Sequence, residues 1–266
     1  MELYKIVVLS VIEGITEFLP VSSTFHLILT SHILGIAQND FAKLFDVFIQ
    51  SGAILSVLII YGLTLLKDRK LLYKVAASFV PTAVVGLILY KVIKGVFFEA
   101  NLLMGIVFAA VGLIFLLVEF LHVKDGTKLK RQISSLNYQE AITIGLVQSL
   151  AVVPGVSRAG AVIVLMILLG FRRDEAAKYS FMLSIPTIFA ASFLDLFKMR
   201  GLIIGHPDYL LFLGLGFVIT FATSFIVVKW LLGYLKTNSL AVFGWYRIGL
   251  VALLFILGAL KIFRFM

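Results

Sequence analysis

Two glutamates, Glu13 and Glu17, lie four residues apart near the start of a strongly apolar chain. On a helix this spacing places both carboxylates on one face, one turn apart. Two ionised carboxylates this close repel each other unless a cation lies between them or one of them holds a proton. An ionisable group at membrane depth is costly, and it is a functional-site hypothesis by default. The pair therefore predicts either a divalent-cation site or an acid–base pair.

A proline and three hydroxyl residues follow the second glutamate. Pro20 ends one expected half-helix, and Ser22, Ser23 and Thr24 open the next. The start of a helix presents unpaired N–H groups and a positive dipole end, which together bind phosphate. His26 stands three residues after Ser23 on the same helical face, where an imidazole can activate a serine or protonate a leaving group. This stretch predicts a phosphate site with a candidate nucleophile.

A second break, Pro154-Gly155-Val156-Ser157-Arg158, resembles the first. Ser157 can cap the following helix, and the Arg158 guanidinium can bind phosphate through two parallel hydrogen bonds. Together the two breaks indicate phosphoryl transfer at a membrane-embedded anion site. Four further polar residues fit a helix-end charge or an interhelical hydrogen bond equally well: Asp46, Gln50, Asp195 and Arg247.

The composition defines the environment in which these residues must work. Of 266 residues, 61% are hydrophobic and 14% are charged, and the mean hydropathy is +1.10. These values exclude a soluble globular domain and predict an integral membrane protein that crosses the bilayer several times. The chain has no cysteine, so it has neither disulfides nor thiolate metal sites. The net charge of +9 is carried mostly by short linkers, which favours anionic lipid headgroups over nucleic acid as the partner.

Six apolar runs are long enough to cross a bilayer, which takes roughly 20 helical residues: 41–66, 71–94, 102–121, 176–199, 208–235 and 240–263. Four other apolar segments are too short to cross, and a proline separates the members of each pair: 3–19 and 21–36, then 138–153 and 155–170. We expect two re-entrant helical hairpins. Each break must then face an internal polar site, because irregular backbone at membrane depth survives only inside protein or beside water.

The two halves of the chain match at an offset of 135 residues. Glu13 then corresponds to Gln148, Ser22 to Ser157, and Gly35 to Gly170. Each half contains one hairpin and three crossings, and an odd number of crossings inverts the second half relative to the first. We therefore predict a single all-α membrane domain over 1–266, built as an inverted repeat. Repeat 1 covers about 1–122, repeat 2 covers about 136–266, and a basic loop over 122–137 joins them.

A modest excess of lysine and arginine lies on the side of the membrane that holds 67–70, 124–131, 172–173 and 236. The positive-inside rule makes this side cytoplasmic and leaves both termini outside.

Two segments resemble the undecaprenyl-diphosphatase family of the bacitracin-resistance type: EGITEFLPVSSTFH at 13–26 and PGVSRAGAVI at 154–163. DVFIQSGAIL (46–55), YSFMLSIP (179–186) and WYRI (245–248) are also similar to family segments, so the resemblance covers nearly the whole chain. It implies hydrolysis of undecaprenyl diphosphate to the monophosphate, which recycles the lipid carrier of cell-wall synthesis and confers bacitracin resistance. It also implies a multi-pass protein of the bacterial inner membrane, with an assisting divalent cation (Mg²⁺ or Ca²⁺) and a site open to the outer face. A homodimer is compatible with this interpretation.

The resemblance also assigns roles to residues. It makes Glu13 and Glu17 the acidic pair and the metal ligands, Ser23 the nucleophile, and His26 its partner. It makes Ser157 and Arg158 the phosphate-binding pair, and from the hydroxyl cluster we expect Ser22 and Thr24 to bind substrate phosphate with them. The chain departs from the family pattern at three positions, since the family usually has glycine at Phe25, serine at Ala159 and threonine at Val162. We expect Phe25 to crowd the hairpin tip, and the other two changes to remove hydroxyl donors to phosphate.

The main alternative is a transporter or flippase of polyprenyl phosphate lipids, because inverted repeats with broken helices around an anion site are typical of transporters. Such a protein would use Arg158 and the helix ends without needing Ser23 or His26. A nucleophile-like serine beside a histidine and an acidic pair favours the enzyme.

Overall fold

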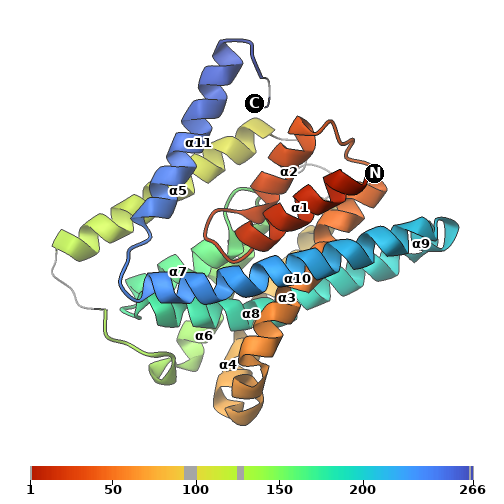
Figure 1. Ribbon diagram of the computed structural model, residues 1–266. Helices are drawn as coiled ribbons and strands as arrows, with labels where there is room; N and C mark the ends of the chain where they lie inside the picture. Colours follow the sequence, from red (N-terminus) through yellow and green to blue (C-terminus); the bar gives the residue numbers. More distant parts are fainter. Residues whose placement is uncertain (1, 93–100, 125–128, 264, 266) are drawn as a thin grey trace.

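The computed structural model describes residues 2–92, 101–124, 129–263 and 265. Among these residues all regular secondary structure is helical (Figure 1), apart from an isolated β-bridge between Arg131 and Phe171. Six helices are long and apolar enough to cross a membrane: α3 (Asp40–Lys67), α4 (Arg69–Val92), α5 (Asn101–Lys124), α8 (Arg173–Lys198), α10 (Asp208–Leu235) and α11 (Ala241–Ala259). The six expected crossings are confirmed, although the run expected over 71–94 extends past the described residues.

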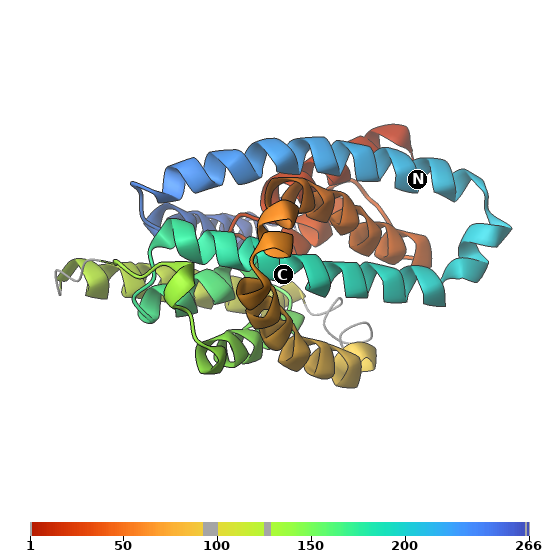
Figure 2. The same ribbon diagram turned by 90° about the horizontal axis from the view of Figure 1, so that it is seen from below.

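Shorter helices occupy the segments expected to form hairpins. They are α1 (Leu3–Thr16), α2 (Ser23–Ile33), α6 (Tyr138–Gln148), the 3-10 turn η3 (Ser149–Val152) and α7 (Arg158–Leu168). Two further short elements were not expected from the sequence: η2 (Ile133–Ser135) and α9 (Arg200–Gly205). α9 joins one end of α8 to α10, and these two long helices run side by side (Figure 2).

The second short helix of each half, α2 or α7, has the same length and lies at a constant offset from its counterpart. α2 and α7 begin at 23 and 158 and end at 33 and 168, so both ends are 135 residues apart. The residue before each helix has a positive φ, 65° at Ser22 and 72° at Ser157, and a glycine with positive φ follows each helix, Gly35 and Gly170. The backbone conformation at the two ends of α2 therefore recurs at the two ends of α7, at the 135-residue offset found in the sequence.

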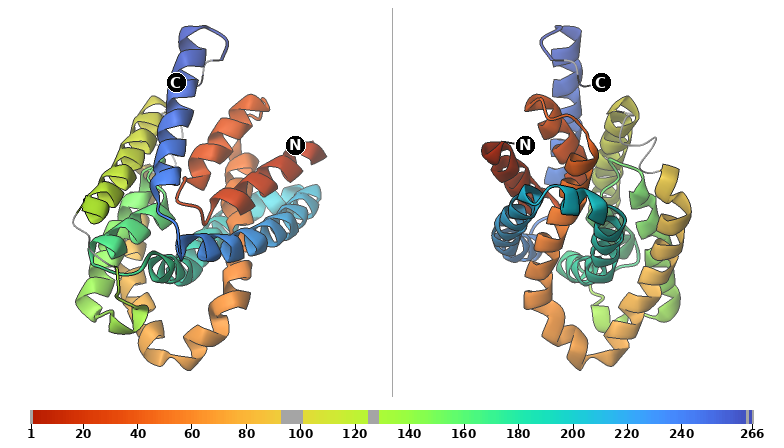
Figure 3. Two further views of the ribbon diagram at one scale, coloured as in Figure 1. Left: turned by 60° about the vertical axis from the view of Figure 1, so that its left-hand side comes forward. Right: turned by 90° about the vertical axis from the view of Figure 1, so that its right-hand side faces the viewer.

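The helices pack in pairs that draw partners from distant parts of the chain. α10 lies along α1 and α3, α4 packs on α6, and α5 packs on α11. α3 and α4 diverge from their junction near Asp68, and α8 contacts both of them (Figure 3). Large apolar side chains point outward from these helices, such as Leu63 at 70% and Ile88 at 73% exposure. Such an apolar exterior is expected where lipid rather than water is the solvent.

Small residues permit the closest helix contacts. A Cβ added at Gly145 of α6 would lie 2.0 Å from the Ser78 carbonyl oxygen of α4. Thr82 of α4 donates to the Gly145 carbonyl at 2.9 Å, and Ser78 donates to the Ala141 carbonyl at 2.6 Å. Close backbone approach with hydroxyl hydrogen bonds is the usual way in which helices associate inside membranes.

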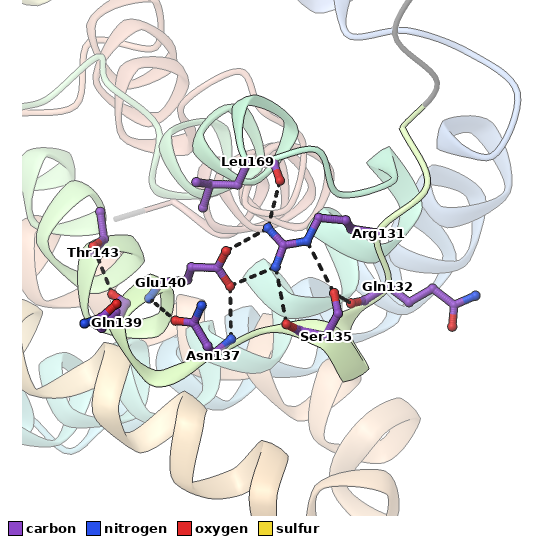
Figure 4. A network of polar contacts seen from close by, with 8 residues as sticks. All are labelled: Arg131, Gln132, Ser135, Asn137, Gln139, Glu140, Thr143 and Leu169. Atoms are coloured by element: carbon purple, nitrogen blue, oxygen red, sulfur yellow. Dashed lines mark hydrogen bonds and ion pairs between the residues drawn. The ribbon is translucent and has the colours of Figure 1, made fainter.

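The segment 129–137, which precedes α6, is fixed to the protein by Arg131 (Figure 4). Its guanidinium donates to both carboxyl oxygens of Glu140, at 2.7 and 3.0 Å, and to the Leu169 carbonyl at the end of α7. Glu140 also closes a capping box with Asn137 at the start of α6. The hydrogen bonds from Arg131 lower the pKa of the Glu140 carboxyl. This network joins α6, α7 and the linker at one end of the molecule.

Candidate active site

The two breaks, one between α1 and α2 and the other between η3 and α7, come together at the side chain of Glu17. Ser23 Oγ donates to Glu17 Oε2 at 2.6 Å, and Arg158 Nη2 donates to Glu17 Oε1 at 3.0 Å. Arg158 Nη1 also donates to the Ser180 carbonyl of α8 at 3.2 Å. Each of Glu17, Ser23 and Arg158 is largely buried. Three side chains singled out from two distant motifs therefore form one contiguous serine–carboxylate–guanidinium group.

Tight turns bring these side chains to the starts of α2 and α7. Ser157 accepts from the Gly160 N–H at 3.1 Å, which is the helix cap expected from the sequence. Ser22 makes no side-chain cap to its helix, so the capping expected of the first hydroxyl cluster was wrong for this residue. Gly155 has a φ of +98°, and a Cβ there would lie 2.6 Å from the Met104 carbonyl oxygen. Only glycine can adopt this conformation so close to α5 without strain.

A fully buried arginine from α11 holds both breaks. Arg247 donates through Nε to the Pro20 carbonyl at 2.9 Å, and through Nη1 to the Gly155 carbonyl at 2.8 Å. Its other contacts are to the carbonyls of Val156 at 3.2 Å and Phe108 at 3.3 Å. From the sequence alone Arg247 fits a helix-end charge or an interhelical hydrogen bond equally well, because nothing in the sequence indicates that both breaks offer it free carbonyls.

Several buried polar atoms near this group find no hydrogen-bond partner among the described residues. They include both carboxyl oxygens of Glu13, one oxygen of Asp46, and Arg158 Nε. Glu13 and Asp46 are buried, on α1 and α3. A buried carboxylate without a partner is expensive, so these groups are expected to hold a proton, a cation or a ligand. The free Nε likewise leaves Arg158 a donor for an incoming anion.

Both ring nitrogens of His26 are hydrogen-bonded to groups other than the Ser23 hydroxyl. Its Nδ1 lies 2.8 Å from the Ser22 carbonyl, and its Nε2 lies 2.7 Å from the Tyr246 hydroxyl of α11. Because a carbonyl can only accept, Nδ1 carries the hydrogen, and in the neutral ring Nε2 accepts from the tyrosine. The ring also stacks on Tyr246. The nearest proton acceptor to Ser23 is therefore Glu17, and the role of His26 stays a prediction.

A cavity of about 600 Å³ opens beside this group. Its lining includes the polar residues Glu17, Ser22, Ser23, Thr24, Ser157 and Arg158. α4 and α8 supply many apolar lining residues, among them Phe79, Leu87, Phe193 and Phe197, and also the polar residues Thr82, Thr187 and Asp195. α3 contributes Lys43 and Gln50. All four predicted phosphate-binding residues line this cavity, whereas Glu13 and His26 lie behind its surface. The cavity can hold an anionic headgroup at one end and an apolar chain along its walls.

The three departures from the family pattern lie away from the cavity. Phe25 stacks on Phe108 of α5 with ring centroids 4.0 Å apart, in a buried apolar cluster. Phe25 therefore packs into this cluster and is not among the residues that line the cavity. Ala159 and Val162 are fully buried and are absent from the cavity lining. Hydroxyl groups at those two positions would not line the cavity as it stands.

The donor set suits a hard divalent cation only in part. Glu13 offers two free carboxyl oxygens one helical turn from Glu17, whose own oxygens already accept from Ser23 and Arg158. Within the described residues no group of three or more histidine, cysteine, aspartate or glutamate side chains is placed to hold a metal. Mg²⁺ usually keeps several waters and binds one or two carboxylates plus substrate phosphates, and that mode fits these residues.

The fold and this group of residues define a polytopic membrane protein with a buried serine–carboxylate–guanidinium group. Residues 6–253 match the family model described as Bacitracin resistance protein BacA, and the chain belongs to that family. A relative from Aquifex aeolicus (strain VF5) is 44% identical over 256 residues, which are 96% of this chain and 98% of that protein. Relatives from Wolinella succinogenes and Persephonella marina are each 40% identical, over 93% and 97% of this chain and 95% and 100% of theirs. All three bear the name undecaprenyl-diphosphatase.

Proposed function

We propose that this protein is a membrane phosphatase that hydrolyses undecaprenyl diphosphate to undecaprenyl phosphate and inorganic phosphate. The observation that carries the proposal is the contact of Ser23 and Arg158 with the two oxygens of Glu17, at 2.6 and 3.0 Å. Relatives of nearly the same length that bear the name undecaprenyl-diphosphatase support the substrate. Hydrolysis returns the lipid carrier to cell-wall synthesis, and it is the basis of bacitracin resistance in this family.

The contacts suggest how the reaction proceeds. Glu17 accepts the proton of Ser23 Oγ, and the serine oxygen attacks the terminal phosphorus of the diphosphate. The bond from that phosphorus to the bridging oxygen breaks, and undecaprenyl phosphate leaves. Water then hydrolyses the phosphoserine and releases inorganic phosphate. Arg158 stabilises the charge on the transferring phosphoryl oxygens, and Ser22, Thr24 and Ser157 orient them.

A divalent cation is part of this proposal. Glu13 would hold it, together with Glu17 when that carboxylate is free and with phosphate oxygens of the substrate. When bound, the cation neutralises negative charge on the diphosphate. The two unpartnered carboxyl oxygens of Glu13 support this assignment.

The cavity also suggests how the lipid is held. Its apolar walls from α4 and α8 would bind the first prenyl units, while the diphosphate lies against the starts of α2 and α7. Ala83, Gly86, Ala190 and Ala191 keep this part of the cavity wide. The remaining prenyl units would extend into the surrounding bilayer.

We further propose that α1–α2 and α6–α7 are re-entrant hairpins of an inverted repeat, and that the cavity opens to the outer face of the bacterial inner membrane. The equal bounds of α2 and α7 and the paired positive φ values before them support the repeat. The excess of basic residues at the opposite ends of the crossings supports the orientation. A homodimer stays a prediction of the sequence.

Release of inorganic phosphate from undecaprenyl diphosphate by the purified full-length protein tests the proposed function. We expect equal amounts of phosphate and undecaprenyl phosphate, loss of the activity with a chelator, and recovery when Mg²⁺ or Ca²⁺ is returned. Folded protein that releases no phosphate would refute the phosphatase. Activity that survives the chelator unchanged would refute the cation and leave the phosphatase standing.

A further inference from the structure

A second cavity, of about 350 Å³, lies at the end of the molecule where α10 ends and α8 begins. Its lining consists of Lys130, Arg172, Arg173 and Lys236, with Asp174, Leu129 and Leu235. Four cations and one carboxylate thus surround one hollow. It shares no lining residue with the cavity at Glu17 and Arg158.

The two arginines of this cavity already have carboxylate partners. Arg172 donates through Nε and Nη2 to the two oxygens of Asp174, each at 3.0 Å. Arg173 donates to both oxygens of Glu119, which also accepts from the Leu240 N–H at 2.8 Å. These bonds fix the shape of the cavity, because they tie α5, the start of α8 and the start of α11 together.

The two lysines have no such partners. Lys130 and Lys236 are exposed, and within the part of the chain that the structure describes neither forms an ion pair. The cavity therefore has an excess of two positive charges, both on side chains that can move toward a ligand. Leu129 and Leu235 give it an apolar margin. A rigid hollow with two free ammonium groups and an apolar edge suits a phosphate carried by an amphiphile.

Aromatic residues place this cavity at the level of the lipid headgroups. The chain has two tryptophans, Trp230 and Trp245, and both are exposed, at 53% and 64%. They lie on either side of the turn between α10 and α11 that contains Lys236 (Figure 1). Trp230 is about 9 Å from Lys236 along the axis of α10, at 1.5 Å per residue. Exposed tryptophans gather at the membrane–water interface, so the lysine lies at or just beyond the headgroups.

We propose that this cavity, lined by Lys130, Arg172, Arg173 and Lys236, binds the phosphate of an anionic membrane phospholipid, with the acyl chains lying along α10 beside Trp230. Basic hollows between membrane helices on one side of the bilayer are typical sites for such headgroups. The recognised chemistry is a phosphate, which free inorganic phosphate also offers, but only a lipid would also use the apolar margin. The inference does not rest on the proposed phosphatase reaction.

Titration of the purified full-length protein in neutral detergent with short-chain phosphatidylglycerol, phosphatidylcholine or inorganic phosphate tests the site, with thermal stability as the readout. A Lys130→Gln/Lys236→Gln variant removes the two free charges. Lys67→Gln/Lys70→Gln is the matched control, because it removes two exposed lysines at the α3–α4 junction, outside the cavity. Neither pair of residues belongs to the proposed catalytic machinery.

We expect phosphatidylglycerol to raise the melting temperature of the parent and the control, with little effect from the other two probes. The Lys130→Gln/Lys236→Gln variant should bind phosphatidylglycerol roughly thirty-fold more weakly, since each basic residue near headgroups contributes a factor of about five. Binding within threefold of the parent would overturn the proposal, and so would an equal loss in the control variant. Equal stabilisation by inorganic phosphate would show an ion site and refute the lipid.

Discussion

Glu17 is the residue of the site whose substitution would be most damaging. It accepts from Ser23 and Arg158 at the same time, so it couples the first break to the second. In the proposed reaction this carboxylate takes the serine proton, while the guanidinium that it orients turns toward phosphate. Arg158 Nε is buried and has no hydrogen-bond partner among the described residues, so the contact with Glu17 does not use this donor.

Arg158 is predicted to be the principal phosphate anchor of the site. Arg158→Lys should be nearly as damaging as Arg158→Ala, because an ammonium keeps the charge but cannot contact Glu17, the Ser180 carbonyl and phosphate at once. A charge-assisted hydrogen bond contributes about 1.5–3 kcal/mol, so losing one or two predicts roughly a ten- to thousand-fold fall in kcat/KM. The measurement is phosphate release by equal amounts of folded protein, with Arg69→Lys as control. A lysine variant within threefold of the parent would refute the anchor role.

Arg247 acts on the reaction through the backbone, so it is a positioning residue. Lysine cannot reach the Pro20, Gly155, Val156 and Phe108 carbonyls together, so Arg247→Lys should loosen the alignment of Ser23 with Arg158. A misplacement of about 1 Å can cost a factor of about 100 in rate. We expect kcat to fall about ten- to hundred-fold while KM changes less than about threefold. A variant that melts at a lower temperature but keeps the parental kcat would show a purely structural role.

Among the elements, the linker before α6 carries the clearest electrostatic contact. Figure 4 shows how Arg131 gathers Glu140, the Ser135 carbonyl and the Leu169 carbonyl around one guanidinium. Arg131 also stacks on Phe171, with its guanidinium carbon 4.1 Å from the ring centroid. The network holds the start of α6 against the end of α7, and thereby supports the second break from outside the membrane-crossing helices.

This contact predicts a pH-dependent stability. Arg131 lowers the pKa of Glu140 in the folded state, so the carboxylate stabilises the fold above its ordinary pKa of 4.5 and loses that effect as the pH falls below it. Near neutral pH, Glu140→Gln should cost about 1–2 kcal/mol. The difference in melting temperature between parent and variant should shrink on going from about pH 7 to about pH 4. A difference that stays constant over that range would mean that the ion pair contributes nothing.

The elements also show how far the sequence could predict the structure. Apolar run length predicted the six crossings, and the prolines at 20 and 154 predicted the two breaks, because both signals are local. α9 was not expected, since its six residues lie between two apolar runs, include an arginine and two glycines, and carry no helical pattern. The sequence predicted that Glu17 and Arg158 belong to one site, but not that their side chains contact each other. That Glu17 and not His26 contacts Ser23 depends on how α11 brings Tyr246 to the imidazole, and no local pattern contains this information.

For the whole molecule, the proposed orientation can be tested directly. α10 has 28 residues and is about 42 Å long, so its two ends lie on opposite sides of the bilayer. The chain has no cysteine, so single cysteines at Ile204, before α10, and at Thr237, after it, are the only thiols in each variant. In intact cells an impermeant thiol reagent should label Ile204→Cys and not Thr237→Cys. Labelling at Thr237 alone would reverse the topology and place the excess of basic residues outside.

The central claim is that one serine at the meeting point of the two breaks carries the hydrolysis of undecaprenyl diphosphate. The most direct measurement compares phosphate release by Ser23→Ala with release by Ser31→Ala, a buried serine two turns further along α2 that does not line the cavity. Loss of the nucleophile should lower kcat at least about a thousand-fold, while Ser31→Ala should stay close to the parent. A Ser23→Ala enzyme that retains more than about a tenth of the parental kcat would contradict the claim.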